Sequence, residues 1–156
     1  IGIDIRDDAL RLAEELGAVK AIKAQTTDDV PAVIHELTSG GAHVSLDTLG
    51  SRATCAGSVR SLRKRGRHVQ VGLLGGSDAT PPVPMELAVA RELELCGSHG
   101  LAAADYPPLL EMVTSGAIDP ARLVSRNIAL RDVPTALAEL GEFANPAITV
   151  VDKFKP

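Results

Sequence analysis

Short apolar runs alternate with helical patterns from the first residue onward. Residues 1–5 (IGIDI) predict a buried strand that ends near a carboxylate. Residues 7–16 then carry apolar side chains at the spacing of one helix face. The first turn of this helix is acidic and Gly17 follows its last residue, both of which are typical of helix ends. The chain therefore opens with a strand followed by a helix.

The later segments repeat this alternation, which is typical of an open, mostly parallel sheet with helices on both faces. Hydrophobic residues make up 45% of the 156 residues and aromatic residues only 2%, so the core is aliphatic, as suits parallel strands buried on both faces. We predict an α/β fold in a single domain over residues 1–156. The further strands are expected at 19–23, 42–47, 68–74, 92–98, 124–128 and 148–152. The further helices are expected after a cap at Thr27 or Asp28, over 51–65, around 86–90, over 106–115 and over 133–140.

The net charge is −4, but one basic run stands out at Arg60–His68 (RSLRKRGRH). The favoured interpretation is a solvated helix end, because cations are stabilised near a helix C-terminus. A phosphate-binding patch is the alternative. No nucleic-acid motif lies nearby, and single-stranded nucleic acid needs the aromatic rings that this chain lacks. Nucleic acid is therefore not expected as a partner.

Cysteine and histidine positions favour neither a disulfide framework nor a metal site. Cys55 and Cys96 lie far apart and outside any CxxC pattern, which predicts a reducing, cytoplasmic location. No apolar stretch approaches the ~20 residues of a membrane helix, and no signal peptide is present. The chain also opens inside a strand-like segment without Met, which predicts a longer parent protein. The four histidines are scattered, so no metal ligands are expected here: His35, His43, His68 and His99.

Asp4 is the first candidate for a binding role, because it ends a strand where open parallel sheets bind ligands. A carboxylate there can accept hydrogen bonds from both adenosine ribose hydroxyls and repels a 2′-phosphate, which favours NAD over NADP. Arg6 complicates this prediction, since a nearby Arg can hold such a phosphate. The structural alternative is that Asp4 simply caps the following helix. A GxGxxG loop should precede Asp4 by ~20 residues, and this chain has none.

Four longer strings, IGIDIRDDALRLAEELGA, GGAHVSLDTLGS, SVRSLRKRGRHVQVGLLGG and ELELCGSHG, carry a resemblance that runs nearly end to end. In this order they resemble the C-terminal, cofactor-binding domain of the zinc-type alcohol dehydrogenases of the medium-chain dehydrogenase/reductase superfamily. The resemblance implies a Rossmann-like sheet without its first strand and phosphate loop. The family's N-terminal catalytic domain, with its zinc ligands, is likewise absent from this chain.

The resemblance also implies roles for individual residues in binding NAD, and none in catalysis or metal binding. Asp4, with Arg6 beside it, would meet the adenosine ribose. The other positions form three groups: Thr48 and Leu49 beside the adenine and its ribose, Val71, Gly72 and Leu73 flanking the nicotinamide, and Ser98 and Gly100 offering backbone groups to the carboxamide.

The parent protein is then expected to interconvert alcohols and aldehydes or ketones by hydride transfer to NAD, with zinc as Lewis acid. A small alcohol or aldehyde would be its substrate. The strand near Glu92–Ser98 would join two copies edge to edge into a homodimer. This chain alone is expected to be inactive and to bind NAD weakly. The alternatives are a zinc-independent NADPH quinone or enoyl reductase of the same superfamily, and a non-catalytic interaction domain that kept the fold.

Overall fold

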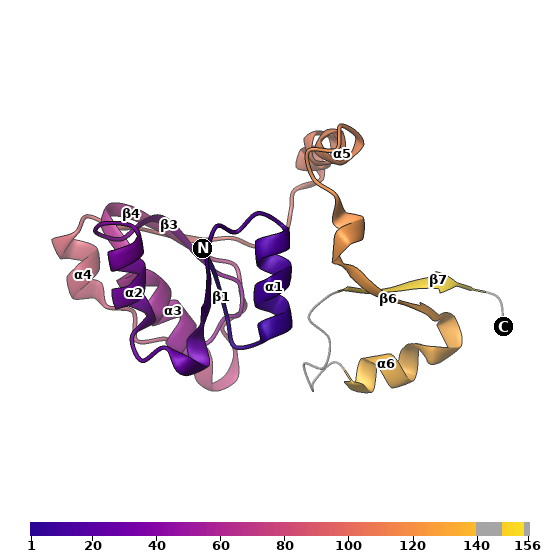
Figure 1. The fold of residues 1–156 in the computed structure, drawn as a ribbon, viewed down its shortest axis with the longest axis horizontal. Helices are drawn as coiled ribbons and strands as arrows, with labels where there is room; N and C mark the ends of the chain where they lie inside the picture. Colours follow the sequence, from indigo (N-terminus) through magenta and orange to yellow (C-terminus); the bar gives the residue numbers. More distant parts are fainter. Residues whose placement is uncertain (140–147, 155–156) are drawn as a thin grey trace. The chain divides into compact units, whose positions relative to one another are not determined.

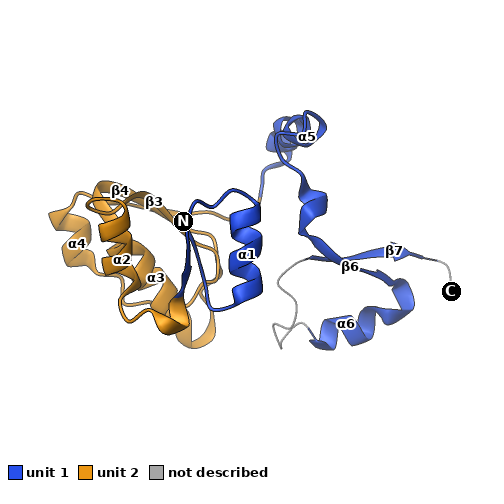
Figure 2. Cartoon of the chain, viewed as in Figure 1, with its two compact units in different colours: residues 1–23, 101–156 blue, residues 24–100 orange. Residues whose placement is uncertain are grey.

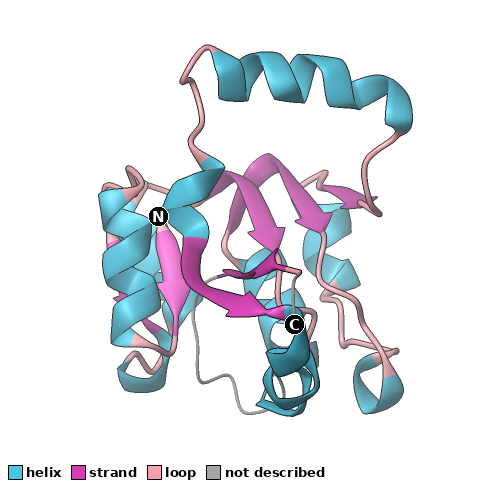
Figure 3. Cartoon of the chain, turned by 90° about the vertical axis from the view of Figure 1, so that its right-hand side faces the viewer, coloured by secondary structure: helices cyan, strands magenta, loops and turns pink. Residues whose placement is uncertain are grey.

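The computed structural model describes residues 1–139 and 148–154, and helices and strands alternate along them (Figures 1 and 3). The chain forms two compact units (Figure 2). Unit 1 consists of residues 1–23 and 101–156, and unit 2 of residues 24–100. The single domain expected over residues 1–156 stays a prediction. None of the described helices is long and apolar enough to cross a bilayer.

Unit 1 begins with the predicted strand and helix. The strand β1 (Gly2–Asp4) pairs in parallel with β2 (Ala21–Lys23), and α1 (Asp7–Glu15) connects the two and contacts both. Leu10 of α1 and Ile22 of β2 are buried, so this helix packs on the strand pair through aliphatic side chains. The remaining elements of unit 1 are α5 (Tyr106–Thr114), β6 (Val124–Ala129), α6 (Val133–Glu139) and β7 (Ile148–Lys153), with β6 and β7 paired in parallel.

Unit 2 holds a three-stranded parallel sheet in the order β3-β4-β5. Its strands are β3 (Ala42–Asp47), β4 (Leu62–Gln70) and β5 (Glu94–Gly97), and its helices are α2 (Val30–Leu37), α3 (Arg52–Arg60) and α4 (Met85–Ala90). The helix α3 contacts β3, β4 and α2, and the core lies beneath it around Ile34, Cys55, Ala56, Val59 and Leu62. Every strand pair among the described residues is parallel, which confirms the predicted α/β class with open parallel sheets.

The basic run is where the predicted elements are wrong. The helix expected over 51–65 ends at Arg60, and β4 begins at Leu62 and ends at Gln70, instead of spanning 68–74. Burial explains the difference, because Leu62 is 0% exposed and pairs with Ala42 at the start of β3. The cations that follow Leu62 are exposed, but they belong to a strand and not to a helix end.

The start of α2 also differs from the prediction. Its cap is Asp29, whose Oδ1 accepts the N–H of Ala32 at 3.0 Å, and not Thr27 or Asp28. Pro31 follows within the first turn, where a missing N–H costs nothing. Other element ends differ from the expected ones by only one or two residues, and Leu140, the last expected residue of the helix near the C-terminus, lies outside the described residues.

A buried carboxylate fixes the loop that leaves β3. Asp47, the last residue of β3, is only 3% exposed. Its Oδ1 accepts the N–H groups of Leu49 and Gly50, each at 3.1 Å. Its Oδ2 accepts the side-chain amide of Gln70, the last residue of β4, at 2.8 Å. One carboxylate therefore ties the loop after β3 to the neighbouring strand.

The same residue also holds the loop that leaves β4. The main-chain oxygen of Asp47 accepts the N–H groups of Val71 at 2.9 Å and Gly72 at 2.8 Å. The Gln70 amide donates a further hydrogen bond to the Gly72 oxygen at 2.9 Å. Buried His68 lies 3.2 Å from Gln70 Oε1 through its Nε2. Each buried polar group of this network thus has a partner, as a stable interior requires.

Glycine lets the two loops touch through their backbones. A Cβ at Gly72 would lie 2.3 Å from the Gly50 nitrogen, and a Cβ at Gly50 would lie 2.4 Å from the Leu73 oxygen. Gly50 also has a φ of +83°, which L side chains rarely adopt. The close contact between residues 48–50 and 71–73 therefore needs glycine at both positions.

We predict that Asp47 makes unfolding sensitive to acid. Burial acts to raise the pKa of its carboxyl, but hydrogen bonds from Gly50, Gln70 and other donors outweigh burial and lower the pKa below the ordinary 3.8. A carboxyl with a lowered folded-state pKa stabilises the fold above its unfolded pKa, and this stabilisation is lost as the pH falls below 3.8 through the folded value. Asp47→Asn should lower the free energy of unfolding by about 1–3 kcal/mol at neutral pH and flatten its decline in acid.

Urea titrations at a series of pH values measure this effect. Asp28→Asn is the matched control, because it removes the same charge from an exposed position in the same unit. Asp28→Asn should keep the pH dependence of the unfolding free energy seen in the unmodified protein. If Asp47→Asn keeps it as well, the assigned role of the Asp47 carboxylate is wrong.

We also predict that Gly72→Ala destabilises the protein by about 1–3 kcal/mol, because the added methyl group pushes the two loops apart. Gly75→Ala provides the comparison, since a Cβ at Gly75 meets nothing within 4 Å and its φ of −134° suits any residue. Thermal and urea unfolding of the two variants measure the difference. Equal stability would contradict the close contact of the loops.

Candidate functional site

Each residue predicted to bind the cofactor lies at or just after the carboxyl end of a parallel strand. That is where open α/β sheets bind ligands. Asp4 ends β1 and Arg6 follows it in unit 1. The others belong to unit 2, where one sheet edge carries all three loops: Thr48 and Leu49 after β3, Val71, Gly72 and Leu73 after β4, and Ser98 and Gly100 after β5.

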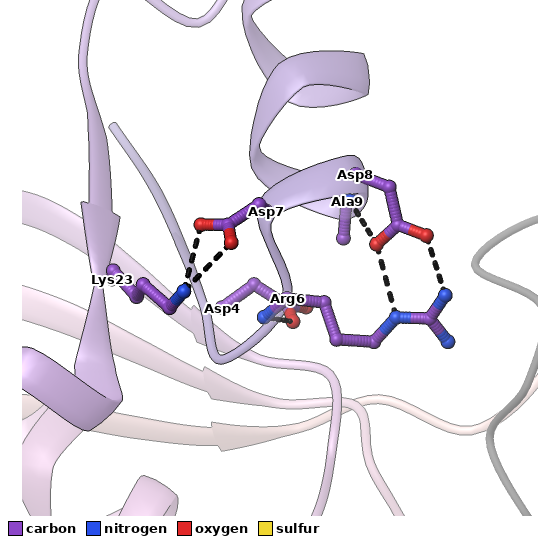
Figure 4. A network of polar contacts seen from close by, with 6 residues as sticks. All are labelled: Asp4, Arg6, Asp7, Asp8, Ala9 and Lys23. Carbon is purple, nitrogen blue, oxygen red and sulfur yellow. Dashed lines mark hydrogen bonds and ion pairs between the residues drawn. The ribbon is translucent and has the colours of Figure 1, made fainter.

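The carboxylate of Asp4 shapes the turn between β1 and α1 (Figure 4). Its Oδ1 accepts the main-chain N–H of Arg6 at 2.9 Å, two residues along the chain. Arg6, and not Asp4, occupies the cap position of α1, so the structural alternative of a simple helix cap is wrong. The second carboxylate oxygen of Asp4 makes no hydrogen bond with the described residues. Asp4 therefore keeps hydrogen-bonding capacity for a ligand.

Arg6 is held in an ion pair with Asp8 in the first turn of α1. Its Nε lies 3.0 Å from Asp8 Oδ1 and its Nη2 lies 2.5 Å from Asp8 Oδ2. The hydrogen bond from Arg6 is the main cause of the lowered pKa of the Asp8 carboxyl, which partial burial opposes. Asp8 reciprocally raises the pKa of Arg6. This pair therefore stays charged across the physiological pH range.

The neighbouring acid has a cation of its own. Lys23, which ends β2, places its Nζ 2.9 and 2.7 Å from the two oxygens of Asp7. Figure 4 shows this pair separate from the Arg6–Asp8 pair. Three carboxylates and two cations thus lie at the carboxyl ends of β1 and β2 and the start of α1, with each cation bound to a different acid of α1.

The loops of unit 2 offer mainly backbone groups and exposed apolar side chains. Leu49, Val71 and Leu73 are exposed, although each is a large hydrophobic residue. The N–H of Ser98 donates to the Gln70 oxygen at 2.9 Å, so the backbone group that Ser98 can offer a ligand is its carbonyl. Gly100 has a φ of +64°, which lets the chain turn sharply after β5.

Three residues that shape the loops after β1, β3 and β4 were not among the predicted site residues. Asp47 and Gln70 hold the loops of unit 2, and Asp8 holds Arg6. Asp47 could have been found, because it closes its strand as Asp4 does and is followed three residues later by glycine. Asp8 was recognised only as a favourable charge at a helix start, since its pairing with Arg6 depends on side-chain direction.

Both cysteines line one shallow hollow of unit 2, together with His68 and Gln70. Burial raises the pKa of the Cys55 thiol, and the nearby Asp47 charge adds to this effect. Cys55 therefore stays a protonated thiol at neutral pH. No group of three or more His, Cys, Asp or Glu side chains among the described residues could hold a metal ion, so these residues do not fit a zinc site.

Comparisons with known proteins agree with this architecture. Residues 1–115 match the family described as zinc-binding dehydrogenase. An erythritol/L-threitol dehydrogenase of Mycolicibacterium smegmatis is 30% identical over 138 residues, covering 88% of this chain and 37% of that protein. An NAD-dependent alcohol dehydrogenase of Sulfurisphaera tokodaii is 30% identical over 144 residues, covering 92% of this chain and 40% of that protein.

Solved structures show the same fold. Benzyl alcohol dehydrogenase from Acinetobacter calcoaceticus matches with a TM-score of 0.83 at 24% identity, over 96% of this chain and 42% of its own. L-Idonate 5-dehydrogenase from Escherichia coli K-12 matches with a TM-score of 0.79 at 26% identity, over 96% of this chain and 42% of its own. The chain thus spans about two-fifths of the length of its relatives. It belongs to the zinc-binding dehydrogenase family and has the α/β fold of the zinc-type alcohol dehydrogenases.

Proposed function

We propose that this chain is the cofactor-binding part of an NAD-dependent dehydrogenase that interconverts alcohols and aldehydes or ketones. The observation that carries this proposal is the Asp4 carboxylate at the carboxyl end of β1, with one oxygen unengaged by the described residues. NAD, when bound, supplies the chemistry by accepting or returning a hydride. The residues of this chain bind and orient it.

Asp4 would accept hydrogen bonds from the adenosine ribose hydroxyls. Its Oδ1 is oriented by the Arg6 N–H, so the carboxylate is fixed before a ligand arrives. Preorganisation of this kind reduces the entropy lost on binding. The negative charge of Asp4 would also repel a 2′-phosphate, which favours NAD over NADP. Engagement of Arg6 by Asp8 argues against the NADPH-dependent reductase alternative.

The loops of unit 2 would contact the rest of the cofactor. Leu49, with Thr48 beside it, would lie against the adenine and its ribose. Val71 and Leu73, exposed on either side of Gly72, would pack against the nicotinamide ring. The Ser98 carbonyl and the backbone of Gly100 would meet the carboxamide. These contacts would use exposed apolar side chains and main-chain groups, and the Asp47 network holds the backbone of the loops after β3 and β4 in place.

Zinc and the substrate would be handled by other parts of the parent protein. The described residues form no metal site, so zinc ligands are expected outside this chain. The substrate, a small alcohol or aldehyde, would likewise be contacted elsewhere. Weak NAD binding and inactivity of these 156 residues alone stay predictions, as does a cytoplasmic location.

We predict that Asp4→Asn weakens NAD binding by the whole protein about 10- to 100-fold, because two ribose hydroxyls lose a charged acceptor. Titration calorimetry with NAD measures the change. Asp7→Asn is the matched control, since it removes the same charge from the same turn while its partner is Lys23. Unchanged NAD affinity in Asp4→Asn would refute the ribose role.

We also propose a homodimer formed through β5, which lies at an edge of its three-stranded sheet. Because Ser98 donates its N–H to β4, the N–H of Gly97 points to the open edge. Gly97→Pro removes that donor and should convert dimers to monomers, whereas Gly97→Ala keeps it and meets nothing within 4 Å. Light scattering of the whole protein checks this prediction. A monomeric unmodified protein, or a dimeric Gly97→Pro variant, would contradict it.

A further inference from the structure

Arg6, the arginine beside Asp4 that could attract a 2′-phosphate, is already bound to an acid. Arg6 directs two of its donors, Nε–H and Nη2–H, at the two oxygens of Asp8, at 3.0 and 2.5 Å. Asp8 Oδ1 also accepts the N–H of Ala9 at 2.9 Å, so the carboxylate is anchored to the first turn of α1 (Figure 4). The guanidinium is thus held along the helix start by a fixed, two-point contact.

This contact matters because Arg6 and Asp4 favour opposite cofactors. An arginine beside the adenosine ribose stabilises a 2′-phosphate, while a carboxylate repels one. Arginine binds a phosphate best by presenting two parallel N–H groups. In this chain the Nε–Nη2 edge, which would do so, is occupied by Asp8. A phosphate reaching Arg6 would have to displace Asp8 or lie beside its negative charge.

We propose that Asp8 is a specificity-determining residue that keeps Arg6 from binding a 2′-phosphate, so that the site excludes 2′-phosphorylated adenine dinucleotides. This inference rests on the proposed NAD-binding function of Asp4. Toward a 2′-phosphate, Asp4 alone supplies only repulsion. Asp8 removes the attraction that Arg6 would otherwise add, and the two acids act together in the choice between NAD and NADP.

The neighbouring pair makes this effect specific to Asp8. Asp7 is bound to Lys23 at 2.9 and 2.7 Å, and Figure 4 draws no interaction between Asp7 and the guanidinium of Arg6. Removing Asp7 therefore changes the local charge by the same amount as removing Asp8 but leaves the Arg6–Asp8 contact intact. The two adjacent aspartates separate a general charge effect from release of one arginine.

The test compares dissociation constants for NAD and NADP in the whole protein. Asp8→Asn should lower the ratio of the NADP to the NAD dissociation constant about tenfold, because Arg6 gains a charge-assisted contact with the phosphate. Asp7→Asn should change this ratio by no more than about twofold, as an exposed pair does. Asp8→Asn combined with Arg6→Ala should lose the gain, which shows that the effect passes through Arg6.

Each other outcome has a distinct meaning. The inference is overturned if Asp8→Asn leaves the ratio of the dissociation constants unchanged. It is also overturned if Asp8→Asn weakens NADP binding, because Asp8 would then orient Arg6 toward the phosphate. In both cases the proposed binding of NAD stands. An equal response in Asp7→Asn overturns it in favour of a general charge effect. If the unmodified protein binds neither dinucleotide, the proposed function fails and the inference fails with it. Thermal unfolding confirms that all variants are folded before binding is compared.

Discussion

The arrangement of the loops at the carboxyl edge of the unit 2 sheet depends on one buried carboxylate. Asp47 ends β3 with its side chain almost wholly out of solvent, and burial of an unpartnered carboxylate would be strongly unfavourable. The N–H groups of Leu49 and Gly50 and the amide of Gln70 compensate for this loss of solvation. Because these donors come from the loop after β3 and from the last residue of β4, stabilising the charge also fixes that loop relative to the neighbouring strand.

This constraint explains how the loops could meet the proposed cofactor mainly through backbone groups and apolar side chains. The groups that the proposed cofactor would meet are backbone carbonyls, glycine and exposed aliphatic side chains around Val71 and Ser98. Backbone positions depend on the Asp47 network and on the contact between Gly50 and Gly72, and not on the identity of the exposed residues. A fold shared with solved structures at 24 and 26% identity is consistent with this division of roles.

Much of the fold could be predicted from the sequence, because apolar periodicity reports directly on burial. The alternation of strands and helices, the parallel pairing and the position of Asp4 at the end of β1 all followed from it. The pattern failed between Arg60 and His68, where charged residues concealed a strand. There a single fully buried side chain, Leu62, fixes the start of β4, and the cations that follow it remain exposed. The density of charged residues therefore predicts secondary structure poorly where one buried apolar side chain determines that the segment is a strand.

The candidate site was predictable in its positions but not in its pairings. Strand ends locate Asp4 in unit 1 and, separately, Thr48 and Val71 in unit 2, since the carboxyl ends of parallel strands gather at one edge of their own sheet. Which cation meets which acid depends on rotamers, and the sequence IRDD gives no sign of them. The structure pairs Arg6 with the second aspartate and Lys23 with the first. A residue that looks suited to a phosphate by position is thereby neutralised by its neighbour, so ligand preference at this turn depends on pairing as much as on composition.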